Sequence, residues 1–467
     1  MQKKLVHSLQ NVVSGQVTDK KDFLDFYSLD SSAFSKRPKL VVFPNTVDDI
    51  KKTILFAKKT KTPVCARGGS TGLVGSSLTN GIIIDMKNFN KIKLSKHHVT
   101  VGAGVSKGEL DLILKKKKKF LGPNPSVGAF CKIGGMVANN SSGSRSLKYG
   151  SVIDNLLEVT LVDGNGNKII LPNNKSISKK IIGISKGTNL LYPNVTKNSA
   201  GYRLDVVDEK NSHKIISGSE STLGIIVQAK LRIFDIPKKR QLTVVGFKKL
   251  DDALYAVPYI LHLNPSALEL VDETIIKNIN YKFQKGTKCL LMIEFDSNVS
   301  KSQKGLNTLL YNFEIIFTSH KISDIEKWWS FRDSALYFTL KKIPKKLLAT
   351  HVIEDTTVPP ENLKYLITFL KQITKKYNLK FVIYGHAGNG NLHIRLISNS
   401  TRNLDKLHKE FFSFVISLDG TISGEHGDGI ARSKYLKLQY SPQLLKKFKQ
   451  IKKQFDPSGI LNPGNII

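Results

Sequence analysis

Hydrophobic positions near the start of the chain alternate between short continuous runs and helical spacing. Leu40–Phe43 is an apolar run typical of a buried strand, and apolar residues then recur at helical spacing from Val47 to Ala57. Thr46 and Asp49 have the spacing of a capping box at the start of that helix. A second apolar run, Thr62–Ala66, leads into a glycine-rich turn. This order predicts a strand–helix–strand unit that delivers the turn.

The rest of the pattern predicts an α+β protein with two lobes. Further short runs predict strands at Ile82–Asp85, Val99–Val101, Leu156–Val162, Gly224–Ile233, Leu242–Gly246, Ala267–Val271, Cys289–Phe295, His351–Glu354, Lys380–Tyr384 and Leu392–Leu396. Helices are predicted from Lys107, near Leu250, Asp324 and Asn362, and over Ser433–Phe455. We place one domain at 1–237, a second with an antiparallel sheet at 238–430, and a C-terminal segment at 431–467 that returns to the first.

Composition excludes several classes. Cys65, Cys131 and Cys289 are widely spaced, which excludes a disulfide framework and a cysteine-only metal cluster. We expect three reduced, buried thiols. No run approaches the roughly 18 apolar residues of a membrane helix, and the basic N-terminal stretch lacks the apolar region of a secretory signal. A cytoplasmic protein is therefore expected.

The formal net charge of +35 leaves three explanations open. The excess is mostly lysine, and Ile and Asn are abundant too, which fits a general compositional bias. Attraction to an anionic membrane surface is the second explanation, and would make the protein peripheral on the inner face of a membrane. Nucleic acid is the least favoured, because the run Lys115–Lys119 has no interleaved arginine or aromatic residue.

Three clusters rich in Gly, Ser and Asn lie in the first lobe, at 67–72, 134–143 and 218–224. The first fits the hydrolase pattern G-x-S-x-G, but residues 73–77 are a poor helix start. No dinucleotide fingerprint or Walker pattern is complete. A single cluster would ordinarily be a structural loop. Three in one lobe favour a large nucleotide cofactor that backbone N–H groups surround.

Histidines flank a turn in the second lobe. His386 and His393 lie on either side of Gly388–Asn391, so a hairpin can bring both imidazoles together. Two neutral imidazoles and a carboxylate are a common divalent-metal set, and Glu425 is available beside His426.

The glycine-rich clusters give the chain a specific resemblance. Arg67–Gly72, Ile133–Asn139 with Tyr149-Gly150, and Gly218–Gly224 resemble the FAD-binding lobe of the vanillyl-alcohol-oxidase superfamily. From about Pro38 to the C-terminus, the order of motifs resembles the FAD-linked D-2-hydroxy-acid dehydrogenases, which include D-lactate dehydrogenases, the glycolate oxidase flavin subunit and D-2-hydroxyglutarate dehydrogenases. The resemblance implies an FAD-binding lobe followed by a substrate (cap) domain.

The resemblance also implies roles for individual residues. It implies FAD binding by Arg67, Gly68, Gly69, Ser70, Thr71, Gly72, Gly134, Gly135, Asn139, Ser142, Gly143, Glu220, Ile226 and Asn462. Because Ser70 stands where relatives that tether FAD carry a histidine, FAD should be bound non-covalently. The implied metal ligands are His386, His393 and Glu425, with zinc expected and iron or manganese as alternatives. His426 is the implied base and Arg332 the implied anchor of the substrate carboxylate.

Two positions depart from the family pattern. Asn389 replaces the usual Asp in the hairpin turn. Ile353 stands where the hydroxyglutarate branch has a lysine, so no partner for a second carboxylate is offered there. This favours D-lactate or glycolate over D-2-hydroxyglutarate, unless another lysine substitutes.

The expected function is therefore oxidation of a small D-2-hydroxy acid. Hydride passes to flavin N5, and electrons pass to a quinone, a cytochrome or an iron–sulfur partner subunit. D-2-hydroxyglutarate oxidation is the alternative within the family. From other classes, a basic nucleic-acid or membrane-surface binding protein and an alkylglycerone-phosphate synthase remain as competitors, although neither needs the histidine hairpin with Glu425 and His426.

Overall fold

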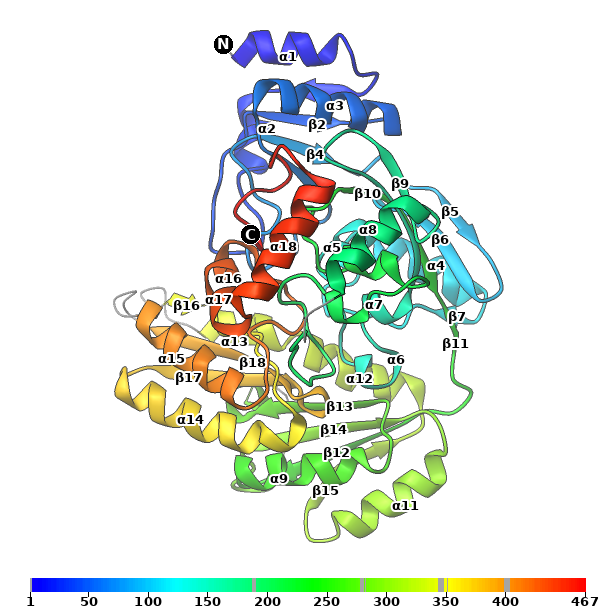
Figure 1. The fold of residues 1–467 in the computed structure, drawn as a ribbon. Helices are drawn as coiled ribbons and strands as arrows, with labels where there is room; N and C mark the ends of the chain where they lie inside the picture. Colours follow the sequence, from blue (N-terminus) through cyan, green and yellow to red (C-terminus); the bar gives the residue numbers. More distant parts are fainter. Residues whose placement is uncertain are drawn as a thin grey trace.

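The chain forms two lobes in the computed structural model, which describes residues 2–186, 190–277, 281, 283–342, 348–350, 352–398 and 404–467 (Figure 1). Strands up to β11 lie in the upper lobe of Figure 1, and β12 to β18 lie in the lower lobe. The mixture of helix and antiparallel sheet confirms the predicted α+β class.

The first lobe contains two sheets. The first has the order β1 (Gln16–Thr18), β2 (Leu40–Phe43), β4 (Ile82–Asp85), β3 (Val64–Arg67), and β2, β4 and β3 are parallel. The second is antiparallel, with the order β5 (Ile92–Leu94), β6 (His98–Gly102), β10 (Ile225–Arg232), β8 (Leu156–Val162), β9 (Lys168–Leu171). β7 (Lys119–Phe120) pairs with β11 (Phe234–Asp235).

Helices of the first lobe connect these strands. They are α1 (Gln2–Gln10), α2 (Lys21–Phe26), α3 (Val47–Thr60), α4 (Lys107–Lys116), α5 (Ile133–Ala138), α6 (Ser146–Tyr149), α7 (Val152–Asn155) and α8 (Lys175–Ser185). The predicted capping box is confirmed, because the Thr46 hydroxyl accepts from the Asp49 N–H and the Asp49 carboxylate accepts from the Thr46 N–H. The predicted strand–helix–strand unit is β2, α3 and β3.

The second lobe is built on one antiparallel sheet. Its order among the described residues is β15 (Glu314–Ser319), β12 (Gln241–Phe247), β14 (Cys289–Phe295), β13 (Ala267–Asp272), β17 (Lys380–His386), β18 (Asn391–Ser398), β16 (Leu348–Thr350). Successive side chains of β14 point to opposite faces. Leu291 and Ile293 join the main hydrophobic core, whereas Leu290 and Met292 join a second core. Both faces of the sheet are therefore buried.

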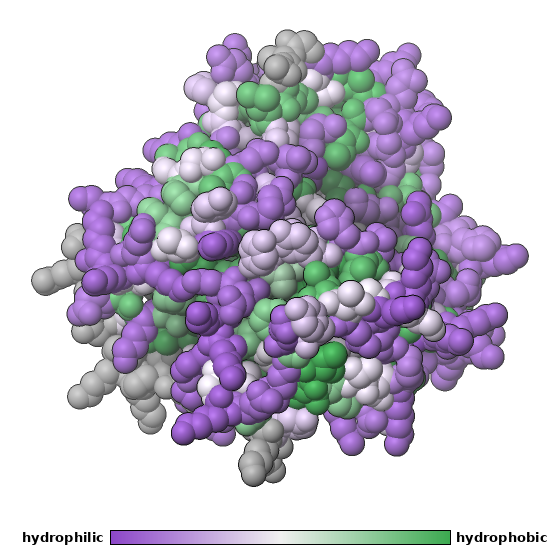
Figure 2. Space-filling view, turned by 90° about the horizontal axis from the view of Figure 1, so that it is seen from below, coloured by the Kyte–Doolittle hydropathy of each residue, from purple (hydrophilic) through white to green (hydrophobic). Residues whose placement is uncertain are grey.

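Helices cover both faces. The second-lobe helices are α9 (Leu250–Leu261), α10 (Glu273–Ile276), α11 (Val299–Leu309), α12 (Ile322–Asp333), α13 (Ala335–Lys342), α14 (Leu363–Lys376) and α15 (Leu404–Ser417). Helices α9, α11, α14 and α15 pack in the main core, and α10, α12 and α13 pack in the second core. Viewed from below, hydrophilic side chains cover most of this lobe, with hydrophobic groups in smaller separate areas (Figure 2).

Two predicted elements are wrong. The predicted strand His351–Glu354 is a bend and turn over 352–355, because the buried Glu354 is drawn toward charged partners; His351 lies outside the described residues. The predicted helix Ser433–Phe455 is split. A short 3-10 turn at Ser433–Tyr435 leads into α17 (Leu436–Gln439), and the longer helix α18 (Pro442–Phe455) starts after a break. Pro442 cannot continue a helix from residues before it, and Ser441 instead caps the N-terminus of α18.

Ion pairs join the lobes close to the second glycine-rich cluster. Arg145 of the first lobe contacts Glu294 of β14 in a two-pronged fashion, at 2.8 and 3.1 Å. Glu294 also accepts from Arg240 at 2.6 Å and from the Trp329 indole at 2.7 Å. Since Trp329 lies on α12, these bonds connect the first-lobe loop to the helix that carries Arg332.

The C-terminal residues return to the first lobe. Leu461 forms a parallel bridge with Val64 of β3, and the N–H of Asn462 donates to the Val64 carbonyl. The helix α18 crosses the front of the molecule to reach this position (Figure 1).

Two expectations from composition can be compared with the structure. All three cysteines are free and buried, as predicted. Among the helices of the described residues, none combines the length and apolar character needed to cross a bilayer.

Candidate active site

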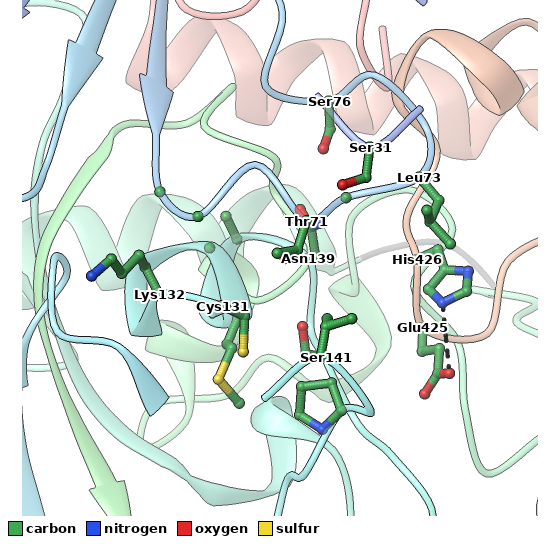
Figure 3. A pocket seen from close by; sticks show the side chains of 18 of the residues that line it. Ser31, Thr71, Leu73, Ser76, Cys131, Lys132, Asn139, Ser141, Glu425 and His426 are labelled. Carbon is green, nitrogen blue, oxygen red and sulfur yellow. Dashed lines mark ion pairs between the residues drawn. The ribbon is translucent and has the colours of Figure 1, made fainter. Parts of the chain in front are cut away.

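A cavity between the lobes brings together nearly all residues predicted for function. Its wall includes Arg67, Gly68, Gly69, Ser70, Thr71, Gly72, Gly134, Gly135, Asn139, Ser142, Gly143, Glu220 and Ile226 from the first lobe, and Arg332, His386, His393, Glu425 and His426 from the remainder of the chain. Figure 3 shows the loop with Thr71 and Leu73 crossing the cavity, with Lys132 and Cys131 toward one end and Glu425 and His426 toward the other.

Glycines shape the first-lobe wall. A Cβ on Gly69 would lie 2.5 Å from the carbonyl oxygen of Phe130, so only glycine lets these two loops approach. A Cβ on Gly135 would meet nothing within 4 Å, because this residue of α5 faces the open cavity. The backbone therefore leaves room for a ligand against both loops, which fits the predicted nucleotide cofactor.

Three predicted cofactor residues direct their side chains elsewhere. The Arg67 guanidinium donates to the backbone carbonyls of Tyr27 and Leu29, although the residue is part of the cavity wall. Asn462 is absent from the cavity wall, and its amide instead donates to the carbonyls of Ser76 and Glu220. These two side chains brace the loops from behind. The Ser142 hydroxyl donates to Glu425 Oε2.

The histidine hairpin forms as predicted. β17 and β18 are antiparallel, with His386 opposite Asn391 and His393 opposite Tyr384. Both imidazoles lie on the same face, and their ring centroids are 5.2 Å apart. His386 Nε2 lies 3.1 Å and His393 Nε2 3.3 Å from Glu425 Oε1. Both predicted histidine ligands therefore point at the same oxygen of Glu425, the third predicted ligand.

The donor atoms of this cluster and their spacing suit a cation site. Glu269 Oε1 lies 2.7 Å from His386 Nδ1, and although burial favours the neutral acid, Arg332 and His386 lower the pKa of Glu269. If Nδ1 of a neutral His386 donates to Glu269, Nε2 is the atom that faces the Glu425 carboxylate, as in a metal-binding histidine. Burial lowers the pKa of His393 to about 4. Ligand atoms bound tetrahedrally at about 2.1 Å stand about 3.4 Å apart, close to the 3.1 and 3.3 Å between Glu425 Oε1 and the two Nε2 atoms. The donor set fits a divalent metal.

Asp355 is a weaker ligand candidate, although it forms with His393, Glu425 and His426 a group, without His386, whose ligand atoms all lie within 4.8 Å of one another. It accepts from the Ser423 hydroxyl at 2.9 Å and from the N–H groups of Glu425 and His426 at 3.0 and 2.8 Å. These bonds use its lone pairs to shape the turn that presents Glu425 and His426.

The His426 imidazole is held by a buried carboxylate. His426 Nδ1 lies 2.6 Å from Glu354 Oε1, and its ring stacks on His393 at a centroid distance of 5.2 Å. Burial opposes the charged imidazolium, but Glu354 and Asp355 raise the pKa of His426 to about 9. Glu354 also contacts Arg395 at 2.7 Å and Arg432 at 3.3 Å, and Arg395 and His426 hold the pKa of Glu354 well below its usual range against burial.

Arg332 reaches the cavity from the last turn of α12. Its guanidinium contacts Glu269 Oε2 through Nε and Nη2, each at 2.6 Å. Glu269 therefore orients both Arg332 and His386 from a central strand of the second lobe.

Sequence reasoning missed several partners in this site. Glu269 carries a detectable signal, because it is an acid in the middle of the apolar run of β13. Glu354 and Lys197 carry none, because their partners lie far away in sequence. Arg395 also lines the cavity and was not predicted.

The two departures from the family pattern have structural accounts. The Asn389 amide donates to the Thr196 hydroxyl at 2.9 Å and accepts from Ser146 at 3.0 Å, so it ties the hairpin turn to the first lobe. Ile353 is fully buried in the main hydrophobic core and is not on the cavity wall. Its apolar side chain therefore does not decide what the cavity accepts.

Two domain families match the chain. The family described as FAD binding domain matches residues 38–171, and the family described as FAD linked oxidases, C-terminal domain, matches residues 236–466. The chain belongs to the FAD-linked oxidases.

Curated proteins that are similar to the chain are named as enzymes of 2-hydroxy acids. It is 28% identical to D-lactate dehydrogenase [cytochrome], mitochondrial, of Arabidopsis thaliana, over all of this chain and 80% of that protein. It is 27% identical to glycolate oxidase subunit GlcD of Bacillus subtilis, over 94% of this chain and 91% of that protein. It is 28% identical to D-2-hydroxyglutarate dehydrogenase of Haemophilus influenzae, and spans about half of that protein.

Solved structures share the fold. p-Cresol methylhydroxylase superposes with a TM-score of 0.72 at 13% identity, covering 99% of this chain and 96% of that one. An alkyldihydroxyacetonephosphate synthase superposes with a TM-score of 0.71 at 20% identity, covering 99% of this chain and 85% of that one. The vanillyl-alcohol-oxidase-type fold expected from the sequence is confirmed.

Proposed function

We propose that the protein is an FAD-dependent dehydrogenase that oxidises a small D-2-hydroxy acid, D-lactate or glycolate, to the 2-oxo acid. The observation that carries this proposal is the shared cavity, where glycine-rich loops face His386, His393, Glu425, His426 and Arg332. The relatives named D-lactate dehydrogenase and glycolate oxidase subunit support it.

Cofactor binding is assigned to the first-lobe loops and to the hairpin. The loops around Gly69 and Gly135 would hold non-covalent FAD, whose N5 would supply the acceptor for the hydride of the substrate α-carbon. His386, His393 and Glu425 would hold a divalent metal, zinc with iron or manganese as alternatives, which would supply a Lewis acid for the α-hydroxyl.

The substrate is oriented by Arg332. Its guanidinium binds the substrate carboxylate, while Glu269 fixes the guanidinium from behind. This holds the α-carbon between the first-lobe wall and the second-lobe histidines.

The hydroxyl proton is removed by His426. Because Glu354 engages Nδ1 as an acceptor, the Nε2 atom of the neutral imidazole carries the lone pair that takes the proton. Glu354 then stabilises the imidazolium that forms, in the way a buried carboxylate supports a catalytic histidine.

D-2-hydroxyglutarate is the second candidate substrate. With Ile353 away from the cavity, the argument against a second carboxylate is lost, and the Arg395 guanidinium lines the cavity beside Glu354. The acceptor is proposed to be a quinone, a cytochrome or an iron–sulfur partner subunit. Cytoplasmic residence, with peripheral attachment to an anionic membrane through the basic surface, is part of the same proposal.

The test is anaerobic reduction of the purified protein by D- and L-lactate, glycolate and D-2-hydroxyglutarate, followed by flavin absorbance. Bleaching by a D acid, and by neither the L acid nor buffer, is expected. A protein that cannot be reconstituted with FAD, or that no 2-hydroxy acid reduces, would refute the proposal. A basic binding protein would instead bind DNA or anionic vesicles with a steep salt dependence and no flavin chemistry.

Two further arms test individual roles. A chelator should abolish reduction, and turnover that survives complete metal removal would contradict the role of His386, His393 and Glu425. His426→Asn should keep FAD bound and slow reduction at least 100-fold. Unchanged reduction would remove His426 as the base.

A further inference from the structure

A buried lysine from the first lobe contacts the proposed metal ligand. The Lys197 side chain is fully buried, and Nζ lies 3.0 Å from Glu425 Oε2 and 3.3 Å from Asn391 Oδ1. Lys197 is not part of the cavity wall, so it does not touch substrate.

The segment around Lys197 is fixed to both motifs of the site. Ser199 donates through its N–H to the Ser423 carbonyl and through its hydroxyl to the Gly424 carbonyl, each at 2.9 Å. Gly201 N–H donates to Asp428 at 2.7 Å. These bonds hold the segment against the Glu425 turn, so the Lys197 side chain lies next to Glu425.

The two oxygens of Glu425 have different surroundings. Oε2 receives the Lys197 ammonium and the Ser142 hydroxyl. Oε1 faces His386 Nε2 and His393 Nε2. A carboxylate whose second oxygen is occupied by two donors can offer only its first oxygen to a metal.

We propose that Lys197 is a positioning residue that, with Ser142, restricts Glu425 to single-oxygen binding of the cation held with His386 and His393. The proposal rests on the metal site of the proposed function. The positive charge of the ammonium also repels the cation and draws electron density from Glu425. The cation therefore stays a stronger Lewis acid than it would be if both oxygens of an unpaired carboxylate bound it. An ion pair that served folding alone would have neither effect.

The experiment compares wild type with Lys197→Met, which keeps length and removes charge, in FAD-loaded protein substituted with Co²⁺. The variant removes the charged donor from Oε2 and leaves only the Ser142 hydroxyl there, so Oε2 should bind Co²⁺ as well, the coordination number should rise and the visible cobalt absorption should weaken. Loss of the repelling charge should slow Co²⁺ removal by a chelator at least 10-fold, and flavin reduction by D-lactate should slow as well. The cobalt spectrum is the readout that a structural role alone would not change.

Lys452→Met is the matched control. Lys452 lies on α18 of the C-terminal segment, and its side chain, 14% exposed, is paired with Asp456 at 2.7 Å. It should reduce stability and leave the cobalt spectrum as in wild type. If Lys197→Met does not fold, Ser142→Ala removes the other donor of Oε2 and should shift the spectrum in the same direction.

The outcomes separate the two proposals. If wild type binds Co²⁺ stoichiometrically and Lys197→Met leaves the cobalt spectrum and the removal rate unchanged, the role of Lys197 is overturned while the metal site stands. The same result in Ser142→Ala has this meaning if Lys197→Met does not fold. A wild-type protein that binds no Co²⁺ overturns the metal site and this inference together. Faster removal of Co²⁺ from Lys197→Met also overturns it, because the lysine would then only support the ligand.

Discussion

Glu354→Gln tests the assignment of His426 most directly. The substitution keeps the side-chain volume and removes the charge that faces His426 Nδ1 at 2.6 Å. The pKa of His426 is raised from 6.5 to about 9, which is worth about 3.4 kcal/mol in favour of the imidazolium. Glu354 is the first of the charges responsible, and a hydrogen bond to a charged group is worth about 1.5–3 kcal/mol.

Losing about 2 kcal/mol of this stabilisation should slow flavin reduction about 30-fold at the pH optimum. The base must be deprotonated, so activity rises with pH through its pKa. Because Glu354 raises that pKa, its removal should move the ascending limb of the profile to lower pH, by one unit or more.

The assay is anaerobic stopped-flow reduction with the best D-2-hydroxy acid from pH 5.5 to 9.5. Glu354→Asp, which retains the charge, serves as control and should keep the limb near its wild-type position. If Glu354→Gln reduces flavin at the wild-type rate with the limb unmoved, Glu354 does not act through His426.

Four further outcomes are expected. Arg332→Lys should lower kcat/KM for the substrate roughly 10–100-fold while FAD stays bound, because a point charge replaces a two-pronged anchor; steady-state kinetics measure this, and an unchanged value contradicts the anchor. With Ser70 in the first loop, acid precipitation should release all flavin into the supernatant, and flavin in the pellet would show a covalent link. Glu294→Gln should cost about 3 kcal/mol in urea unfolding, because it removes the fully buried carboxylate that pairs with two partly buried arginines. Burial raises the pKa of Glu294, but these arginines outweigh burial and lower the pKa to about 2. The stabilisation that Glu294 provides is therefore present above about pH 4.5 and is lost as the pH falls toward 2. Glu294→Gln should not show this loss. Burial raises the pKa of Asp428 to about 7, so the native state should lose stability as the pH rises from about 4 to 7. The difference in thermal midpoint between Asp428→Asn and wild type should therefore shift in favour of the variant over that range.

Local patterns predicted the fold well where the deciding interaction lies within a few residues. The Thr46–Asp49 capping box, the hairpin with His386 and His393, and the glycine-rich turn after β3 all depend on neighbours in sequence. Pro442 carried the signal for the break before α18, and the amphipathic spacing on both sides obscured it.

Predictions failed where partners are distant in the chain. Glu354 and His426 are 72 residues apart, and Lys197 and Glu425 are 228 apart, so no periodicity links them. Ile353 shows the opposite error, since a position matched by motif need not face the cavity when its strand is replaced by a turn.

The return of the chain at Leu461 and Asn462 has a consequence for biosynthesis. β3, which already pairs with β4, gains a second parallel neighbour, and the first loops gain the Asn462 brace, only when these residues are present. On the ribosome the first lobe is synthesised early, but residues 456–467 must leave the exit tunnel before its loops can reach their final arrangement. Cofactor capture should therefore follow translation of the entire second lobe, and a bulky fusion directly after Asn462 should delay it more than one placed before α1.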